Sequence, residues 1–291
     1  MVSCTEPSEL RAQAHALTVL PHLASTDVAT LEHLASDFLV SNDPEVSHQL
    51  RVALRRLRVL LWAYQDLLPD ALAKYWRQQL GEMAAQISAP RNWDVIIDEL
   101  LRAAIPPSHP SVLILLETLE GIRHRAREES RSAFSLTKPR LLISAFTVAL
   151  DQVAGARPDK SETVGEFARA RVETASRRLN RQLGRAMDGS FRELHQTRIQ
   201  IKRLRYLLEY FSPVLTKADR KRIRRLTALQ GALGELNDVV VAASYISEFP
   251  TEPEHAPTQK LFLRWLSEEK KTRRHKAVIA LRQLVRKMPE A

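Results

Sequence analysis

The sequence predicts an all-α fold built from two similar helical bundles. Two features of composition favour helices: Leu, Ala and Arg dominate, and only 8 of the 291 residues are Gly. A third observation is an internal repeat, because a segment that starts at residue 48 recurs without a gap 147 residues later. We therefore expect two antiparallel bundles of the four-helix type, related by pseudo-symmetry and forming one compact unit. The expected parts are an N-terminal extension at 1–26, a first bundle at 27–154 and a second bundle at 155–291.

Helix start and stop signals place the elements of the first half. Residues 8–40 predict two short helices with a break near Pro21. Asp43, Pro44 and Glu45 then form a strong start signal, as an N-cap, a first helical residue and an acidic first turn. The further helices expected in this half span 44–67, 70–103 with a break at SAPRNWD (88–94), 111–134 and 139–154.

The second half begins after AGARPDKSE (154–162), a small and polar segment that is the expected boundary. Its third helix is predicted to be interrupted between Gly231 and Asp238. No convincing strand pattern occurs anywhere in the sequence. The helices expected in this half span 161–186, 190–211, 217–248 and 258–287.

The charge of the chain predicts a polyanionic partner. Lys and Arg number 44 against 34 Asp and Glu, which gives a formal net charge of +10 and a pI of about 10.0. Residues 151–291 carry the whole excess, with 29 basic against 17 acidic side chains, whereas residues 1–150 carry 15 against 17. Nucleic acid, an anionic membrane surface and a condensed phosphate all fit such a protein, and net charge does not choose among them.

Several function classes are excluded at this stage. A single cysteine, Cys4, cannot form an internal disulfide or supply a cysteine-based metal cage. No apolar run is long enough for a signal peptide or a membrane span, so we expect a cytoplasmic protein. The nucleotide-binding and hydrolase motifs GxxxxGK[ST], GxSxG and HExxH are missing. We therefore expect no cofactor, no metal site and no catalysis.

The two copies of the repeat carry matched basic residues. HQLRVALRRLRVLLWAYQDLLP starts at His48, and HQTRIQIKRLRYLLEYFSPVLT starts at His195. At about 100° per residue on a helix, His48, Arg51, Arg55 and Arg58 fall within about an 80° arc, opposite an apolar face. The pairs at an offset of 147 are His48 with His195, Arg51 with Arg198, Arg55 with Lys202, Arg56 with Arg203, Arg58 with Arg205, Lys74 with Lys221 and Arg77 with Arg224.

A basic stripe on an amphipathic helix is most often a solvated face. Solvated faces usually mix charges of both signs, yet no acid lies between Glu45 and Asp66 or between Glu193 and Glu209. Like charges three or four residues apart each destabilise a helix by roughly 0.2–0.5 kcal/mol, and both copies carry them at identical spacing. An anionic ligand is the simplest compensation.

The two histidines allow two interpretations. A lone histidine near a helix start is more often a hydrogen-bonded structural residue than a ligand-binding one. The alternative hypothesis is that His48 and His195 each donate to a phosphate oxygen, in which case binding strengthens as pH falls from about 8 to 6.

At these residues the sequence resembles the CHAD family, the conserved histidine α-helical domain. The resemblance rests on the doubled H-x-x-R-x-x-x-R/K-R-L-R helix and on LQGALGELNDVVV (229–241), and it covers residues 27–288. It implies two four-helix bundles and a basic central surface or channel that binds inorganic polyphosphate without catalysis. One departure is visible: the usual RDxDV reads RNWDV, with Asn92 in the first acidic position and Asp94 kept. The E-x-E-x-K signature of the triphosphate tunnel domain is missing, so no triphosphatase activity is expected.

The resemblance also implies the partners and the binding residues. Inorganic polyphosphate is the expected ligand, and polyphosphate granules or polyphosphate-metabolising proteins are the expected associates in the cytoplasm. Nucleic acid is the alternative polyanion, and an enzyme acting on phosphorylated substrates ranks third because no nucleophile or metal constellation is found. The expected binders are His48, Arg51, Arg55, Arg56, Arg58, His195, Arg198, Lys202, Arg203 and Arg205, with Lys74, Arg77, Lys221 and Arg224 as a second tier.

Overall fold

The computed structural model describes residues 11–105, 110–156, 162–250, 253–254 and 256–286, and within these residues the chain forms helices and no strand. An isolated antiparallel bridge joins His15 to Thr163. The all-α prediction is therefore confirmed, while Cys4 and part of the expected boundary at 154–162 lie outside the described residues. The helices are α1 (Leu20–Val40), α2 (Pro44–Ala63), α3 (Asp70–Gln86), α4 (Ser88–Asp94), α5 (Arg102–Ala104), α6 (Pro110–Leu136), α7 (Pro139–Gly155), α8 (Val164–Arg185), α9 (Phe191–Tyr210), α10 (Lys217–Glu248) and α11 (Ala256–Arg286), with a π-helical turn η1 (Val95–Leu101) and 3₁₀ turns η2 (Ala186–Asp188) and η3 (Ser212–Val214).

Of the helix breaks expected at two proline segments, the one near Pro21 is wrong, and the one at SAPRNWD is displaced to the residue before it. Pro21 does not interrupt a helix but lies in the first turn of α1, where its missing N–H leaves no intrahelical bond unmade. The SAPRNWD segment is itself helix α4, with Pro90 in its first turn. The chain breaks one residue earlier, at Ile87, which caps both α3 and α4 and is fully buried.

The interruption expected between Gly231 and Asp238 is also wrong, because α10 is continuous over 32 residues. Glycine in an exposed helix costs only about 1 kcal/mol relative to alanine. Leu229, Leu233 and Leu236 bury the inner face of α10 through this stretch. Their burial outweighs the low helix propensity of the two glycines there.

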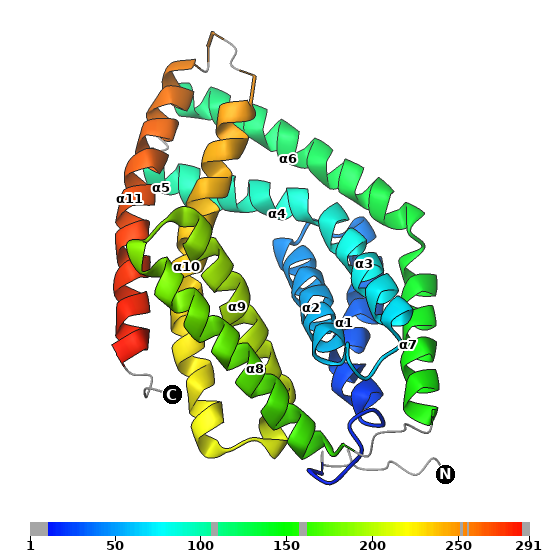
Figure 1. Cartoon of the computed structure of the whole chain (residues 1–291). Helices are drawn as coiled ribbons and strands as arrows, with labels where there is room; N and C mark the ends of the chain where they lie inside the picture. Colours follow the sequence, from blue (N-terminus) through cyan, green and yellow to red (C-terminus); the bar gives the residue numbers. More distant parts are fainter. Residues whose placement is uncertain (1–10, 106–109, 157–161, 251–252, 255, 287–291) are drawn as a thin grey trace.

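Helices α2 and α9 lie next to each other at the centre of the molecule (Figure 1). Each has 20 residues, and α9 begins 147 residues after α2. The aromatic rings of Tyr64 and Phe211, at the C-terminal ends of the two helices, lie 6.5 Å apart between centroids. Since Arg51 and Arg198, near the N-terminal ends, are also electrostatic neighbours, the two helices run parallel.

The other helices surround this central pair. Helices α1, α3 and α7 accompany α2, whereas α8, α10 and α11 accompany α9 (Figure 1). Helices α4, α5 and α6 cross from the first group to the far ends of α10 and α11. The central pair is thus covered on both outer sides, and its polar faces meet in the interior of the molecule.

Two hydrophobic cores hold the halves together. The larger core extends from α1 through α2 and α3 to α8, α9 and α11. The smaller core joins side chains of η1 and α6, such as Ile97 and Leu115, to Val239 and Phe262 of α10 and α11. Both cores contain residues from each side of the boundary expected at 154–155. The division into two bundles stays a prediction.

Candidate functional site

Helices α2 and α9 begin at well-defined caps. The Asp43 carboxylate accepts a hydrogen bond from the backbone N–H of Glu45 at 2.8 Å, and Pro44 opens α2 as the sequence predicts. Ser190 caps α9 by accepting from the N–H of Glu193 at 3.4 Å. Leucines such as Leu54 and isoleucines such as Ile201 are fully buried on the outer faces of the pair. This burial fixes the helix rotation and turns the basic faces toward each other.

A pocket of about 350 Å³ opens between the two basic faces. It lies on the side of α2 and α9 that α3 and α8 flank, and six of its nine lining side chains are cationic. No carboxylate lines it. The lining residues are Arg55, Arg58, Val59, Trp62, Arg77, Arg198, Ile199, Lys202 and Arg203.

The floor of the pocket holds closely packed cations. Burial, followed by the charges of Arg55 and Arg198, lowers the pKa of Lys202 to about 6, and this lysine is only 8% exposed. Arg51 lies outside the pocket lining, next to these cations, and burial followed by the charges of Arg55 and Arg91 lowers its pKa to about 10. The buried Nε atoms of Arg55 and Arg198 have no hydrogen-bond partner within the described residues. Such donors are strongly unfavourable unless an anion occupies the pocket.

The mouth of the pocket is formed by arginines held against apolar surfaces. The Arg58 guanidinium lies over Gly81 of α3, at 3.3 Å from the position that a Cβ would take there. The Arg203 guanidinium lies 5.3 Å from the centroid of the Trp62 ring, and that of Arg178 on α8 lies 5.2 Å from it. Burial first, and neighbouring arginines second, lower the pKa of Arg58 and Arg203. These contacts hold the guanidiniums in place while leaving their charge uncompensated.

Two of the expected binders, Arg56 and Arg205, are not part of the pocket. The Arg56 Nε donates to the Asp27 carboxylate at 2.8 Å, and its Nη1 donates to Glu209 at 2.6 Å. Arg205 also pairs with Glu209 and donates to the Gln230 side chain at 2.9 Å. Both arginines are neutralised by acids, so their geometry is that of structural ion pairs.

The two histidines and Arg51 lie outside the pocket lining. Arg51 donates to the backbone carbonyl of Ser88 at 3.0 Å, which ties α2 to α4. The Nδ1 of His195 lies 3.0 Å from the Oδ1 of Asn237. The His48 side chain is exposed over part of its surface, and the burial of the remainder is the main cause that lowers its pKa. The charge of Glu45 raises this pKa, whereas the charges of Arg91, Arg55 and Arg51 lower it. The two histidines therefore do not share an environment, although they match in the repeat.

Among the second-tier residues, only Arg77 lines the pocket. Lys74, Lys221 and Arg224 are exposed and are not among the lining residues. The contribution of Arg178 was not predicted, because the residue 147 positions earlier is Leu31 and the repeat gives no signal there. The position of Trp62 follows from α2 itself, since it lies one turn after Arg58 on the same face.

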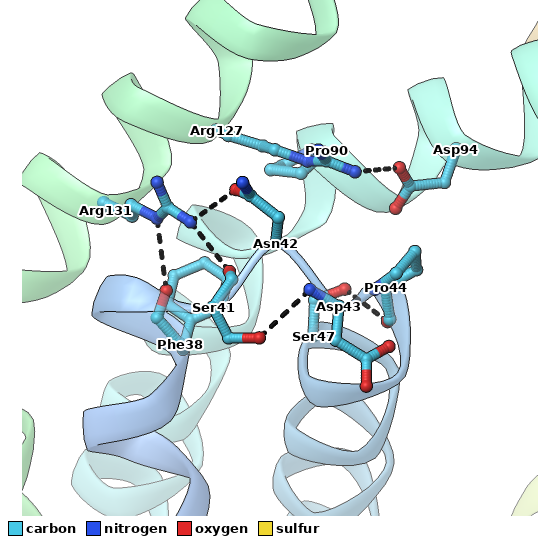
Figure 2. A pocket seen from close by; sticks show the side chains of 10 residues that line it. All are labelled: Phe38, Ser41, Asn42, Asp43, Pro44, Ser47, Pro90, Asp94, Arg127 and Arg131. Carbon is cyan, nitrogen blue, oxygen red and sulfur yellow. Dashed lines mark hydrogen bonds and ion pairs between the residues drawn. The ribbon is translucent and has the colours of Figure 1, made fainter.

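Asp94 stabilises the corner that precedes α2, not a pocket arginine. It is 2% exposed and accepts from Arg127 of α6 at 2.8 Å (Figure 2). In the same corner, Arg131 donates to the Ser41 carbonyl at 2.7 Å and to Asn42 at 2.8 Å. Asn92, in the position that departs from the family pattern, donates to the Tyr245 hydroxyl of α10 at 2.9 Å. Its amide thus bridges the two halves.

No group of His, Cys, Asp and Glu within the described residues has the arrangement of a metal site. Over the same residues, no single helix is long and apolar enough to cross a membrane. The bent pair Val112–Leu136 and Pro139–Gly155 passes that test jointly, by length and composition.

The model of the family described as "CHAD domain" matches residues 23–247, which is most of the chain. The chain belongs to the CHAD domain family. Its fold is similar to that of the crystal structure of the CHAD domain from the plant Ricinus communis, with a TM-score of 0.81, 23% identity and 95% coverage of both chains.

A second solved structure shares the fold of this CHAD domain at a greater distance. PptA from Streptomyces chartreusis matches with a TM-score of 0.65 and 18% identity, covering 91% of this chain and 99% of that one. At such identities the likeness concerns the fold alone. No protein of curated function matches the sequence.

Proposed function

We propose that this CHAD domain binds inorganic polyphosphate in the pocket between α2 and α9 and does not turn it over. The observation that carries the proposal is an acid-free pocket in which both halves of the chain place cations, with Arg55 and Arg58 facing Arg198 and Lys202. Asp238 is an acidic neighbour of Arg198 and Lys202, but it does not line the pocket, where cations outnumber it. Buried cations in such excess favour a ligand of high negative charge density. Guanidinium forks suit phosphate oxygens because two N–H groups can donate to one phosphate group.

The surroundings of Trp62 favour polyphosphate over nucleic acid. Proteins that bind single strands offer aromatic faces on which bases stack. Trp62 is only 9% exposed and lies beside the guanidiniums of Arg178 and Arg203, so its ring is not available to a base. Polyphosphate supplies the same charge without bases.

The lining of the pocket also supports binding without turnover. It contains no carboxylate, hydroxyl or imidazole that would hold a metal ion, and its one amine, that of Lys202, is 8% exposed and lies among arginines. In the cell, the domain is proposed to act in the cytoplasm at polyphosphate granules or with polyphosphate-metabolising proteins.

A competition experiment tests the function. Labelled long-chain polyphosphate is bound to the full chain at fixed salt, then displaced with unlabelled polyphosphate, single-stranded DNA or double-stranded DNA, while phosphate release is followed. We expect polyphosphate to displace the label at the lowest concentration, a steep loss of affinity with added salt, and no phosphate release. Arg282→Gln, an exposed charge change on α11, serves as the control and should bind like the wild type.

Other outcomes contradict the proposal in distinct ways. Tighter binding of DNA would make the pocket a nucleic-acid site. Phosphate release that disappears in the Arg55→Gln variant would make the domain an enzyme.

A further inference from the structure

The central pair of helices has two flanks. One flank faces α3 and α8 and carries the pocket, and the other faces α1 and α10. In the repeat, α3 corresponds to α10, because α10 begins 147 residues after α3. Helix α1 corresponds to α8, because α1 packs against α2 as α8 packs against α9. Two equivalent halves would make the two flanks alike.

The residues that distinguish the flanks are few. The pocket flank has Trp62, and the residue 147 positions later, on the second flank, is Glu209. Arg178 of α8 corresponds to Leu31 of α1, which is fully buried. Asp27 of α1 likewise has no acidic counterpart, because the residue 147 positions later is Thr174. The second flank therefore gains two acids and lacks a cation.

Glu209 changes the state of the arginines on the second flank. Arg56 and Arg205 are the counterparts of the pocket arginines Arg203 and Arg58, and both are ion-paired with Glu209. Arg56 is also paired with Asp27, which is 5% exposed and accepts from the Tyr210 hydroxyl at 2.5 Å. A phosphate approaching this flank meets two carboxylates, and the guanidiniums of Arg56 and Arg205 are already compensated by them.

We infer that the binding site is one-sided: polyphosphate occupies only the flank between α3 and α8, and Glu209 is the residue that excludes it from the flank between α1 and α10. This inference rests on the proposed function. It makes the site of this chain a pocket with one binding face, not a channel with two, and predicts one ligand chain per domain.

Two variants at corresponding positions provide the test. Arg77 of α3 lines the pocket, whereas Arg224 of α10, its counterpart in the repeat, is exposed, and neither forms an ion pair within the described residues. Calorimetric titration of polyphosphate of one short length into each full-length variant should show roughly a tenfold loss of affinity for Arg77→Gln. For Arg224→Gln the affinity should stay within about twofold of the wild type, with a stoichiometry near one in both.

A third variant tests the role of Glu209 directly. Glu209→Gln removes the negative charge and keeps the side-chain shape, so Arg205 becomes attractive to phosphate and Arg56 keeps Asp27 as its one acid. When Arg224→Gln is added to the Glu209→Gln variant, it should reduce the affinity or the stoichiometry of polyphosphate binding. The same substitution in the wild-type protein should change neither. Circular dichroism of each variant checks that the helices are kept, and if Glu209→Gln does not fold, the comparison of Arg77→Gln with Arg224→Gln still decides.

The outcomes separate the inference from the proposed function. Equal losses for Arg77→Gln and Arg224→Gln, or a larger loss for Arg224→Gln, would overturn the one-sided site while leaving polyphosphate binding intact. Binding that neither substitution affects would likewise overturn it. Failure of the wild type to bind polyphosphate would overturn the proposed function and this inference together.

Discussion

At the scale of the residue, Lys202 makes the pocket sensitive to pH. Its counterpart in the first half is Arg55. Because burial and neighbouring cations lower the pKa of Lys202 to about 6, the lysine is mostly neutral at pH 7 in the empty pocket. A bound polyanion favours the charged form of Lys202, so binding takes up a proton.

The lowered pKa of Lys202 also affects folding stability. Between about pH 6 and 10, Lys202 binds fewer protons in the folded chain than in the unfolded chain, so its contribution to the free energy of unfolding increases as pH rises.

The first prediction concerns the pH dependence of polyphosphate affinity. In the wild type, affinity should rise as pH falls from 8 to 6, by up to about tenfold per pH unit. Lys202→Arg keeps the charge but removes the titration, so its affinity should be higher at pH 8 and depend less on pH. Titration of the ligand's own end groups is common to both proteins and cancels in the comparison. Identical pH profiles would show that Lys202 does not titrate on binding.

A second prediction at this scale concerns Asp27. Its carboxylate is buried between Arg56 and Tyr210, and Asp27→Ala leaves a half-buried guanidinium with Glu209 as its remaining acid. Loss of one partner of a buried pair should lower the free energy of unfolding by about 3 kcal/mol. The matched control is Asp66→Ala, which removes an exposed carboxylate paired with the half-buried Arg171 and should cost less than about 1 kcal/mol. Urea unfolding measures both, and equal effects would contradict the structural role given to Asp27.

At the scale of the element, helix α3 shapes the mouth of the pocket through a glycine. Gly81 lies in the middle of α3, where glycine lowers helix stability by roughly 0.5–1 kcal/mol relative to alanine. Its missing Cβ lets the Arg58 guanidinium lie against the helix, since a Cβ would stand 3.3 Å from Arg58 Cζ. Because the far end of a side chain is flexible, the helix can accept the methyl group, and Arg58 moves instead.

The third prediction therefore separates stability from binding. Gly81→Ala should raise the unfolding midpoint in urea yet weaken polyphosphate binding by about two- to fivefold, because it displaces a phosphate donor. The control is Gly121→Ala in α6, where nothing lies within 4 Å of the added methyl group. It should give a similar gain in stability with no change in affinity. Unchanged affinity in Gly81→Ala would remove Arg58 from the site.

At the scale of the whole molecule, the sequence predicted the helices well because their start signals are local. Asp43 caps α2 and Pro44 opens it as expected, since capping depends on neighbouring residues only. The breaks at Pro21 and Gly231 were wrong because a proline in a first turn and a glycine opposite a buried leucine face are both tolerated.

The site was predictable in its residue types and less so in its geometry. The repeat identified Arg55, Arg58, Arg198, Lys202 and Arg203, which line the pocket. It could not separate them from Arg56 and Arg205, because the pairing of these two depends on acids of α1 and α9. Arg205 and Glu209 are four residues apart on α9, so their spacing is visible in the sequence. The pairing of Arg56 with Asp27 and Glu209 is set by contacts between different helices, and no single helix pattern records it.

The last prediction is that the two halves unfold together. The smaller core joins Ile97 and Leu115 of the first half to Phe262 and Leu266 of the second, and all four side chains are buried. Phe262→Ala should lower the free energy of unfolding by about 3–5 kcal/mol and move a single transition, seen at the same urea concentration by far-UV circular dichroism and by tryptophan fluorescence. The tryptophans report on both sides, because Trp62 and Trp93 belong to the first half and Trp265 to the second. Two separate transitions in the wild type, or a shift of one probe without the other in Phe262→Ala, would show that each bundle folds on its own. A single shift would mean that polyphosphate bound between α2 and α9 stabilises the entire chain.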